Sequence, residues 1–278
     1  MKLLPEIILG YLLLVLGMFV FQRSFMYFPE TSRPEPINGM QAVNVLTSDE
    51  INISGWLVPT AQRSDKVIIF FHGNAGHAAH RIYKAALYVH AGYSVMLAEY
   101  RGYGGNDGRP TEEGFYKDAR AQIDYLINQK GYSEEQIILY GESIGSGVAV
   151  QMAQEYNDVH ALILETPFSS MVDVAMKRYF YVPVRLLLLD RYDSARKISS
   201  IDMPVLIGHG KKDNVVPYAS ARRLYDKVTS QEKRFLDYDE GDHNNLYQYG
   251  FGGDVLKFLS GIDGDNEDNK QVEILTEE

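Results

Sequence analysis

The chain has 278 residues and a mass of 31.5 kDa, and its 45% hydrophobic and 23% charged residues exclude a disordered chain, a collagen-like repeat and a multi-span membrane protein. It contains no cysteine, which excludes disulfides, a cysteine nucleophile and thiolate metal sites. Residues 263–278 account for −6 of the formal net charge of −10, and the rest of the chain offers no basic face for nucleic acid.

The N-terminal segment predicts a membrane anchor. Residues 7–21 carry no charge, and with Leu3 and Leu4 they make a helix of roughly 28 Å, close to the thickness of a bilayer core. No small-residue cleavage site follows, and three aromatic residues suit the membrane interface: Phe25, Tyr27 and Phe28. We predict that residues 1–28 are an uncleaved single-pass anchor, with a cleaved signal peptide or a buried core helix as alternatives. Basic residues flank both ends almost equally, so the side of the membrane stays open.

Residues 29–262 alternate between strand and helix patterns. Short runs that are apolar on both faces predict buried parallel strands at 67–71, 95–98, 137–139, 161–164 and 205–207. Amphipathic stretches between them predict helices at 77–90, 111–130, 144–156 and 218–228. A hairpin is expected at 42–46 and 53–58. The order predicts an α/β domain with a mostly parallel sheet.

Two segments fall outside this alternation. Residues 166–202 form the one long gap and are expected to be a lid inserted over the strand ends. Within it, Leu186–Leu189 is interpreted as core packing, with an acyl-pocket lining or a lipid contact as the alternative. The acidic tail, 263–278, has almost no aromatic residues and is expected to be disordered.

A serine on a sharp turn is the strongest chemical signal. The strand Ile137–Tyr140 runs directly into Gly141-Glu142-Ser143-Ile144-Gly145, and a helix follows at once. This is the G-x-S-x-G pattern in its strand–turn–helix context. To project its hydroxyl from the sheet edge, Ser143 must occupy a strained turn whose neighbours lack bulk. We predict that Ser143 is a nucleophile.

A serine nucleophile needs a base that an acid orients. Of the seven histidines, His243 is the candidate because its loop follows the last strand-like run, at the sheet edge where α/β proteins place their sites. Asp213 follows the preceding strand and is the predicted acid, with Asp237 or Asp239 as substitutes. The order Ser143, Asp213, His243 is that of one known triad topology.

Further site residues follow from the loop after the first buried strand. His72-Gly73-Asn74-Ala75-Gly76 opens a helix, and its glycines let backbone amides turn inward. The amides of Asn74 and Ile144 are the predicted oxyanion donors. Four further residues are expected to bind substrate: Gly73, Glu142, Tyr103 and Phe168.

Four blocks carry a resemblance: FFHGNAG, YRGYGGNDGRP, GESIGSG, and GHGKKDNVVP followed by GDHNN. They resemble the α/β-hydrolase fold family from about residue 42 to 259. More narrowly, the chain is similar to single-anchor α/β-hydrolase-domain proteins, a group that includes acyl-protein thioesterases. The features that carry this similarity are the YFP at Tyr27–Pro29 and the residues Asp190, Tyr192, Lys197 and Ile198. The resemblance implies an eight-stranded sheet and a serine esterase or thioesterase. It departs from the better-known depalmitoylases, whose cysteine-rich N-terminus is replaced here by an apolar helix.

Other patterns are weaker. The glycine-rich stretch Gly102–Gly108 has Asp107 at the sixth position, which disfavours a dinucleotide loop. His77 and His80 have no carboxylate at ligand spacing, so no metal or other cofactor is predicted. The predicted function is hydrolysis of small-molecule or lipid esters or thioesters at a membrane. A serine peptidase on the same fold and a non-catalytic, membrane-tethered binding protein are the alternatives.

Overall fold

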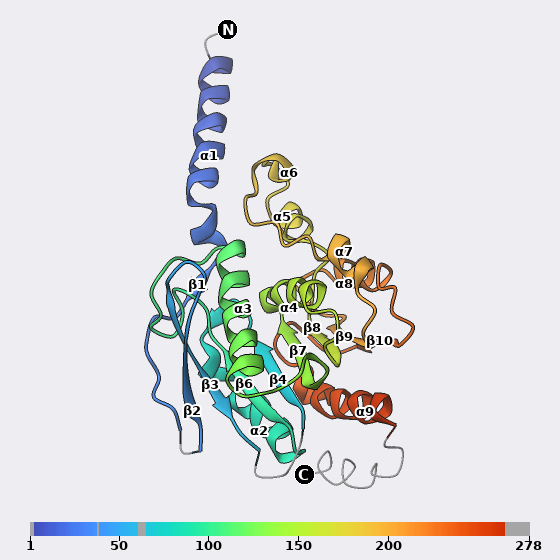
Figure 1. Cartoon of the computed structure of the whole chain (residues 1–278). Helices are drawn as coiled ribbons and strands as arrows, with labels where there is room; N and C mark the ends of the chain where they lie inside the picture. The colour runs from blue at the N-terminus through green and yellow to red at the C-terminus, as the bar shows by residue number, and fades with distance from the viewer. Residues whose placement is uncertain (1–2, 38, 61–64, 265–278) are drawn as a thin grey trace.

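The structure is a computed structural model that describes residues 3–37, 39–60 and 65–264. Within these residues an eight-stranded sheet runs in the order β2-β3-β6-β4-β7-β8-β9-β10, shown in Figure 1. The strands are β2 (Gln41–Leu46), β3 (Asn52–Val58), β4 (Val67–Phe71), β6 (Ser94–Ala98), β7 (Ile137–Glu142), β8 (Ala161–Glu165), β9 (Val205–Gly210) and β10 (Lys233–Tyr238).

The sheet is antiparallel at one edge and parallel elsewhere. The hairpin β2–β3 pairs antiparallel and joins β6 antiparallel, whereas β6 through β10 are parallel neighbours. The prediction of an α/β-hydrolase fold with a mostly parallel sheet and a leading hairpin is confirmed. Because β4 lies between β6 and β7, the chain order reverses at β4, and the loops after β4 and β7 leave the sheet side by side. Such a reversal is where α/β sheets bind ligands.

Helices cover both faces of the sheet. One hydrophobic cluster holds α3 (Glu112–Asn128), α4 (Ile144–Glu155) and α8 (Tyr218–Tyr225), and the other holds α2 (Ile82–His90) and α9 (Phe251–Asp263). Alternate residues of the buried strand β4 belong to alternate clusters, as the period of two requires. The short helices are η1 (Ala78–Arg81), η2 (Glu134–Gln136), η3 (Ile198–Ser200) and η4 (Leu246–Tyr249).

The start of α3 shows how the sequence defines a helix end. The side chain of Thr111 accepts a hydrogen bond from the Gly114 amide at 2.9 Å, and Glu112 and Glu113 occupy the first turn. The cap satisfies a backbone donor, and the acids complement the helix dipole. The cap is the first residue of the helix range predicted from the amphipathic pattern, 111–130.

The apolar N-terminal segment forms α1 (Leu3–Met26), a single helix that projects from the domain (Figure 1). Its mean hydropathy is 2.3, and none of its apolar window is buried, so it is not a core helix. After it, β1 (Phe28–Pro29) pairs in parallel with β5 (Ala75–Gly76). The sequence analysis did not predict this two-stranded sheet, which joins the end of α1 to the loop after β4.

The segment 166–202 is helical and lies beside α1 (Figure 1). It contains α5 (Met171–Arg178), α6 (Val184–Leu187) and α7 (Ser194–Lys197). The interpretation of Leu186–Leu189 as core packing is wrong, because Leu186 and Leu189 are exposed and Leu187 and Leu188 line a pocket. The helix α9 includes Asp263, which pairs with Lys66 at 3.2 Å, so the acidic tail begins one residue later than expected. Residues 265–278 lie outside the described residues.

Candidate active site

Ser143 lies on a strained turn between β7 and α4. Its φ is +52° and its ψ is −117°, a backbone conformation that costs free energy for any residue with a side chain. Only glycine fits two residues before and two residues after Ser143. A Cβ on Gly141 would lie 2.6 Å from the Gly145 carbonyl oxygen, and a Cβ on Gly145 would lie 2.1 Å from the Phe71 carbonyl oxygen. The turn therefore requires the glycines from which it was predicted.

Ser143, His243 and Asp213 form one hydrogen-bonded chain. The Ser143 Oγ lies 2.8 Å from His243 Nε2, and His243 Nδ1 lies 2.7 Å from Asp213 Oδ2. The other carboxylate oxygen, Oδ1, accepts the Val215 and Val216 amides at 2.8 Å each. Asp213 therefore has a fixed orientation, with one oxygen directed at the imidazole.

Electrostatics keep Asp213 ionised. Burial opposes ionisation, but the hydrogen bond and charge of His243 outweigh it and hold the pKa of Asp213 below its ordinary value. A second ring, His209, has its Nε2 3.4 Å from Asp213 Oδ2. Burial lowers the pKa of His209, so that ring is neutral at pH 7 and does not compete for the carboxylate as a cation.

The predicted oxyanion donors meet at Ser143: Asn74 lies on the loop after β4, and Ile144 is the first residue of α4. The backbone N–H groups of Asn74 and Ile144 donate to no acceptor among the described residues. The Asn74 side chain is fixed instead: its Nδ2 donates to the Met26 carbonyl at 2.6 Å, and its Oδ1 accepts from the Phe28 amide at 3.2 Å. The end of α1 therefore holds the loop that carries the Asn74 amide.

Tyr103 was expected to bind substrate, and the structure places it elsewhere. Its ring is fully buried and does not line the pocket at Ser143. Its hydroxyl donates to Asn74 Oδ1 at 2.9 Å. Tyr103 is therefore a positioning residue behind the Asn74 loop. The sequence could not show this, because a tyrosine in a glycine-rich loop fits either environment.

Four charged side chains lie beneath Ser143, three of them buried and the fourth, Arg81, partly exposed. Of the four, only Glu142 could be singled out from the sequence. Glu142 accepts from Arg81 Nη2 at 2.5 Å and from Lys84 Nζ at 2.7 Å, and Lys84 also donates to Glu165 at 2.7 Å. Burial opposes the ionisation of Glu142, but Lys84 and Arg81 outweigh it and hold its pKa well below the ordinary value. Burial raises the pKa of Glu165, and the charge of Lys84 opposes this shift. Together these side chains fix the residue that precedes Ser143.

We expect Lys84→Met to lower the free energy of unfolding by about 3–5 kcal/mol, because it leaves two carboxylates buried without their shared cation. Denaturant unfolding in detergent micelles measures the effect. The matched control is Lys117→Met, whose ammonium pairs with Asp49 at 3.2 Å in a partly exposed position. This control should cost about 1 kcal/mol or less. Equal effects of the two substitutions would contradict the assigned role of the buried charges.

A pocket of about 770 Å³ opens at Ser143. Three of the four expected substrate-binding residues line it: Gly73, Glu142 and Phe168. The outer part is formed by apolar residues of the segment 171–188 and by five residues of α1: Met18, Phe19, Gln22, Phe25 and Met26. The apolar N-terminal helix is thus a wall of the pocket, which a pattern-based division into anchor and domain could not reveal.

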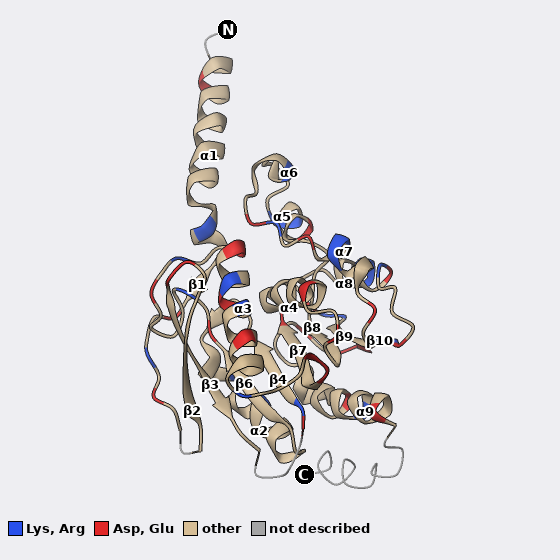
Figure 2. Ribbon diagram, viewed as in Figure 1, with Lys and Arg blue, Asp and Glu red and all other residues tan. Residues whose placement is uncertain are grey.

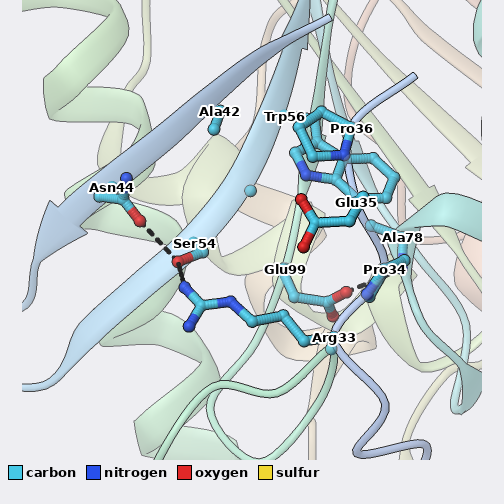
Figure 3. Close-up of a pocket in the computed structure, with 12 residues that line it drawn as sticks. Arg33, Pro34, Glu35, Pro36, Ala42, Asn44, Ser54, Trp56, Ala78 and Glu99 are labelled. Carbon is cyan, nitrogen blue, oxygen red and sulfur yellow. Dashed lines mark hydrogen bonds between the residues drawn. The ribbon is translucent and has the colours of Figure 1, made fainter.

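A second cavity of about 370 Å³ lies between the segment 33–36 and the strands β2 and β3. Figure 3 shows Arg33, Glu35 and Glu99 among the residues that line it. Glu99 binds His72 Nε2 at 2.6 Å and accepts the Ala78 amide at 2.8 Å. Its carboxylate therefore holds the start of the loop that carries Asn74, and none of the three triad residues lines this cavity.

One group of side chains has the composition of a metal site. The carboxylate of Glu30 lies 3.6 Å from His77 Nε2 and 3.8 Å from His80 Nε2, with all three ligand atoms within 4.8 Å of one another. The expectation that no carboxylate joins the two histidines is wrong, because the β1–β5 pairing brings Glu30 beside them. Glu30 and His80 are about half exposed, and the proposed chemistry at Ser143 does not use this group.

Comparisons with known proteins agree with this architecture. A family model described as "Serine aminopeptidase, S33" matches residues 62–190 and 188–248. The chain is 36% identical to the uncharacterised protein Rv2307c of Mycobacterium tuberculosis, over 81% of each chain. It is 29% identical to YNL320W of Saccharomyces cerevisiae, called an uncharacterised membrane protein, over 79% of each.

Among solved structures, the chain is similar to the esterase Pf2001 of Pyrococcus furiosus, with a TM-score of 0.70 at 17% identity over 84% of this chain and 98% of that one. At this identity the likeness shows the fold. The family match covers most of the central domain. The chain therefore belongs to the serine aminopeptidase S33 family of α/β hydrolases.

Proposed function

We propose that this protein is a membrane-anchored serine hydrolase that cleaves carboxylic esters or thioesters through an acyl-enzyme on Ser143. The observation that carries the proposal is the chain of hydrogen bonds from Ser143 through His243 to Asp213, at 2.8 and 2.7 Å. A serine on a strained turn that contacts an oriented imidazole is the arrangement that nucleophilic acyl transfer requires.

The reaction has two halves. His243 Nε2 takes the Ser143 proton as Oγ attacks the carbonyl carbon, and the amides of Asn74 and Ile144 stabilise the oxyanion. His243 then gives the proton to the leaving alcohol or thiol, and the acyl group stays on Oγ. Water then attacks the acyl carbon as His243 takes its proton, and the same amides stabilise the second oxyanion. This intermediate collapses by breaking its bond to Ser143 Oγ, which takes the proton back from His243, and the carboxylic acid leaves. Asp213 holds the imidazole in the required tautomer and stabilises its cation.

The charges of the pocket favour esters and thioesters over peptides with a free N-terminus. Glu142 is the one acid among the described lining residues, and it is already paired with Arg81 and Lys84. An aminopeptidase pocket needs a carboxylate free to bind the substrate ammonium. Lys177 and Arg178 also line the pocket, and neither forms an ion pair within the described part of the chain, so the charges available there are cationic.

We infer that α1 remains on the mature chain as the membrane anchor. Its length and hydropathy suit a bilayer, and its last turns form part of the pocket. Removal as a signal peptide would take away one wall of the pocket. No metal or organic cofactor is part of the proposed reaction.

The test is covalent labelling with a fluorophosphonate probe of the full chain in detergent micelles. We expect a stoichiometric adduct that peptide mass spectrometry maps to Ser143. A non-catalytic, membrane-tethered binding protein would give no adduct, and that result would overturn the proposal. A peptidase would also label, so a separate, unlabelled sample of the enzyme is assayed with p-nitrophenyl butyrate and leucine p-nitroanilide. Preference for the anilide would contradict the ester and thioester assignment.

A further inference from the structure

Polar side chains of α1 form hydrogen bonds with the backbone of the neighbouring segment Met171–Asp190. This segment is the part of the predicted lid insertion (166–202) that is called the lid from here on. Tyr11 Oη donates to the Tyr181 carbonyl at 2.9 Å. The side chain of Gln22 makes two such bonds: its Nε2 donates to the Leu187 carbonyl at 3.3 Å, and its Oε1 accepts from the Leu189 backbone amide at 2.8 Å. In hydrocarbon every backbone polar group must find a protein partner. These contacts supply such partners to Tyr181 and Leu189, which lie outside the helices, and to Leu187 at the end of α6.

The residues of α1 that face the lid lie on one stripe of the helix. Tyr11, Met18, Gln22 and Phe25 are spaced by seven, four and three residues, which places them on a single face. At 1.5 Å per residue, Tyr11 lies roughly 22 Å from the end of α1 at Met26. The lid therefore lies along the C-terminal part of α1, as far as Tyr11, and Figure 1 shows α5 and α6 on this side of the helix. The medium that surrounds this part of α1 also surrounds the lid.

The outer surface of the lid is apolar in the way that a bilayer contact requires. Phe180 is 84% exposed and Leu186 is 83% exposed, and neither lines the pocket. Figure 2 shows that α1 carries no charge between Glu6 and Arg23. The lid cations Lys177, Arg178 and Arg185 are exposed, and their long stems allow the charged groups to reach the interface. Exposed aromatic and leucine side chains next to an apolar helix mark a membrane-contacting surface.

The space between α1 and the lid leads to Ser143. Met18 and Phe25 form one wall and Leu187 and Leu188 the other, with Ser143 and His243 at the inner end. Its volume of about 770 Å³ is in the range of pockets that enclose a lipid-sized ligand. An acyl chain could move along this apolar passage from the bilayer to the nucleophile without entering water.

We propose that the lid inserts into the bilayer together with α1, and that the passage between them admits the acyl chain of a membrane-resident substrate from the side. The substrate class is a long-chain acyl ester or thioester held in the bilayer. This inference rests on the proposed function and adds the substrate class and its route. The acyl chain occupies the apolar passage, and the scissile carbonyl lies at Ser143.

Insertion of the lid is tested by fluorescence quenching in the full chain, reconstituted in phosphatidylcholine vesicles with brominated acyl chains. Phe180→Trp should be strongly quenched relative to vesicles without bromine. The matched control Leu46→Trp lies on the exposed edge strand β2 and should show no added quenching. The native Trp56 is common to both variants. Equal quenching of the two variants would overturn the insertion of the lid.

The route is tested with p-nitrophenyl palmitate and p-nitrophenyl butyrate. Met18→Trp fills the passage, and we expect the palmitate-to-butyrate ratio of kcat/KM to fall about tenfold or more. Leu16→Trp places the same bulk on the opposite face of α1, outside the pocket, and should leave the ratio unchanged. An unchanged ratio in Met18→Trp, with Ser143 still labelled, would overturn the route alone. Absence of labelling in the wild type would instead overturn the proposed function.

Discussion

Ser143→Ala should lower kcat for p-nitrophenyl butyrate by about 10⁵–10⁶-fold, to the residual rate that binding and oxyanion stabilisation support. The Ser143 Oγ lies 2.8 Å from His243 Nε2, and its removal takes away the atom that would carry the acyl group. His243 could still activate a water molecule, but that route lacks the covalent step. Steady-state kinetics measures the effect, with titration by a fluorophosphonate to count active sites in the wild type.

The control for this substitution is a serine in the first turn of α4. Ser146 Oγ donates to the Ser143 carbonyl at 2.5 Å and contacts no other triad residue in the described structure. Ser146→Ala removes a hydroxyl but no nucleophile, and we expect a loss of about tenfold or less. Activity of Ser143→Ala within about tenfold of the wild type would place the chemistry at another residue.

Asp213→Asn should lower kcat by about 10⁴-fold with little change in the fold. The asparagine side chain has the shape of the carboxylate that it replaces. However, its NH₂ group would donate to His243 Nδ1, so the single proton of the neutral imidazole must lie on Nε2. The imidazole then cannot accept the Ser143 proton. Asp237→Asn is the matched control, because Asp237 was the alternative acid and binds the Tyr218 hydroxyl instead. The account is contradicted if Asp237→Asn is the more damaging change.

The same substitution has a pH signature. His243 and the Val216 amide lower the pKa of Asp213 against the opposing effect of burial. A lowered pKa stabilises the fold above the unfolded value of about 3.9, and this contribution is lost as the pH falls through the folded value. The difference in unfolding free energy between wild type and Asp213→Asn should therefore shrink below about pH 4. A difference that stays constant through this range would show that ionisation is not its source.

The fold and the proximity of the triad residues were predictable because their signals are local. The buried strands are continuous apolar runs in the sequence, and each candidate catalytic residue lies in the segment after a strand. Parallel strands place their carboxyl ends at one edge, so Ser143, Asp213 and His243 could be expected to meet there. The glycines beside Ser143 are required by the backbone turn itself. Their catalytic roles remain predictions.

What the sequence did not reveal depends on contacts between distant segments. Lys84 and Glu165 lie on a helix and a strand far apart in the chain, and nothing in either pattern pairs them. Glu30 joins His77 and His80 only through the two-residue strands β1 and β5. The contact of Gln22 with the lid spans 167 residues. Periodicity indicates which face is apolar, but not which partner covers it.

The central claim, that Ser143 carries the acyl group, is tested most directly by rapid-quench mass spectrometry of the full chain during turnover of a p-nitrophenyl ester. The account predicts a transient mass increase equal to one acyl group, located on the peptide that contains Ser143 and released as turnover ends. Turnover with no acylated peptide, or acylation of a different residue, would contradict it.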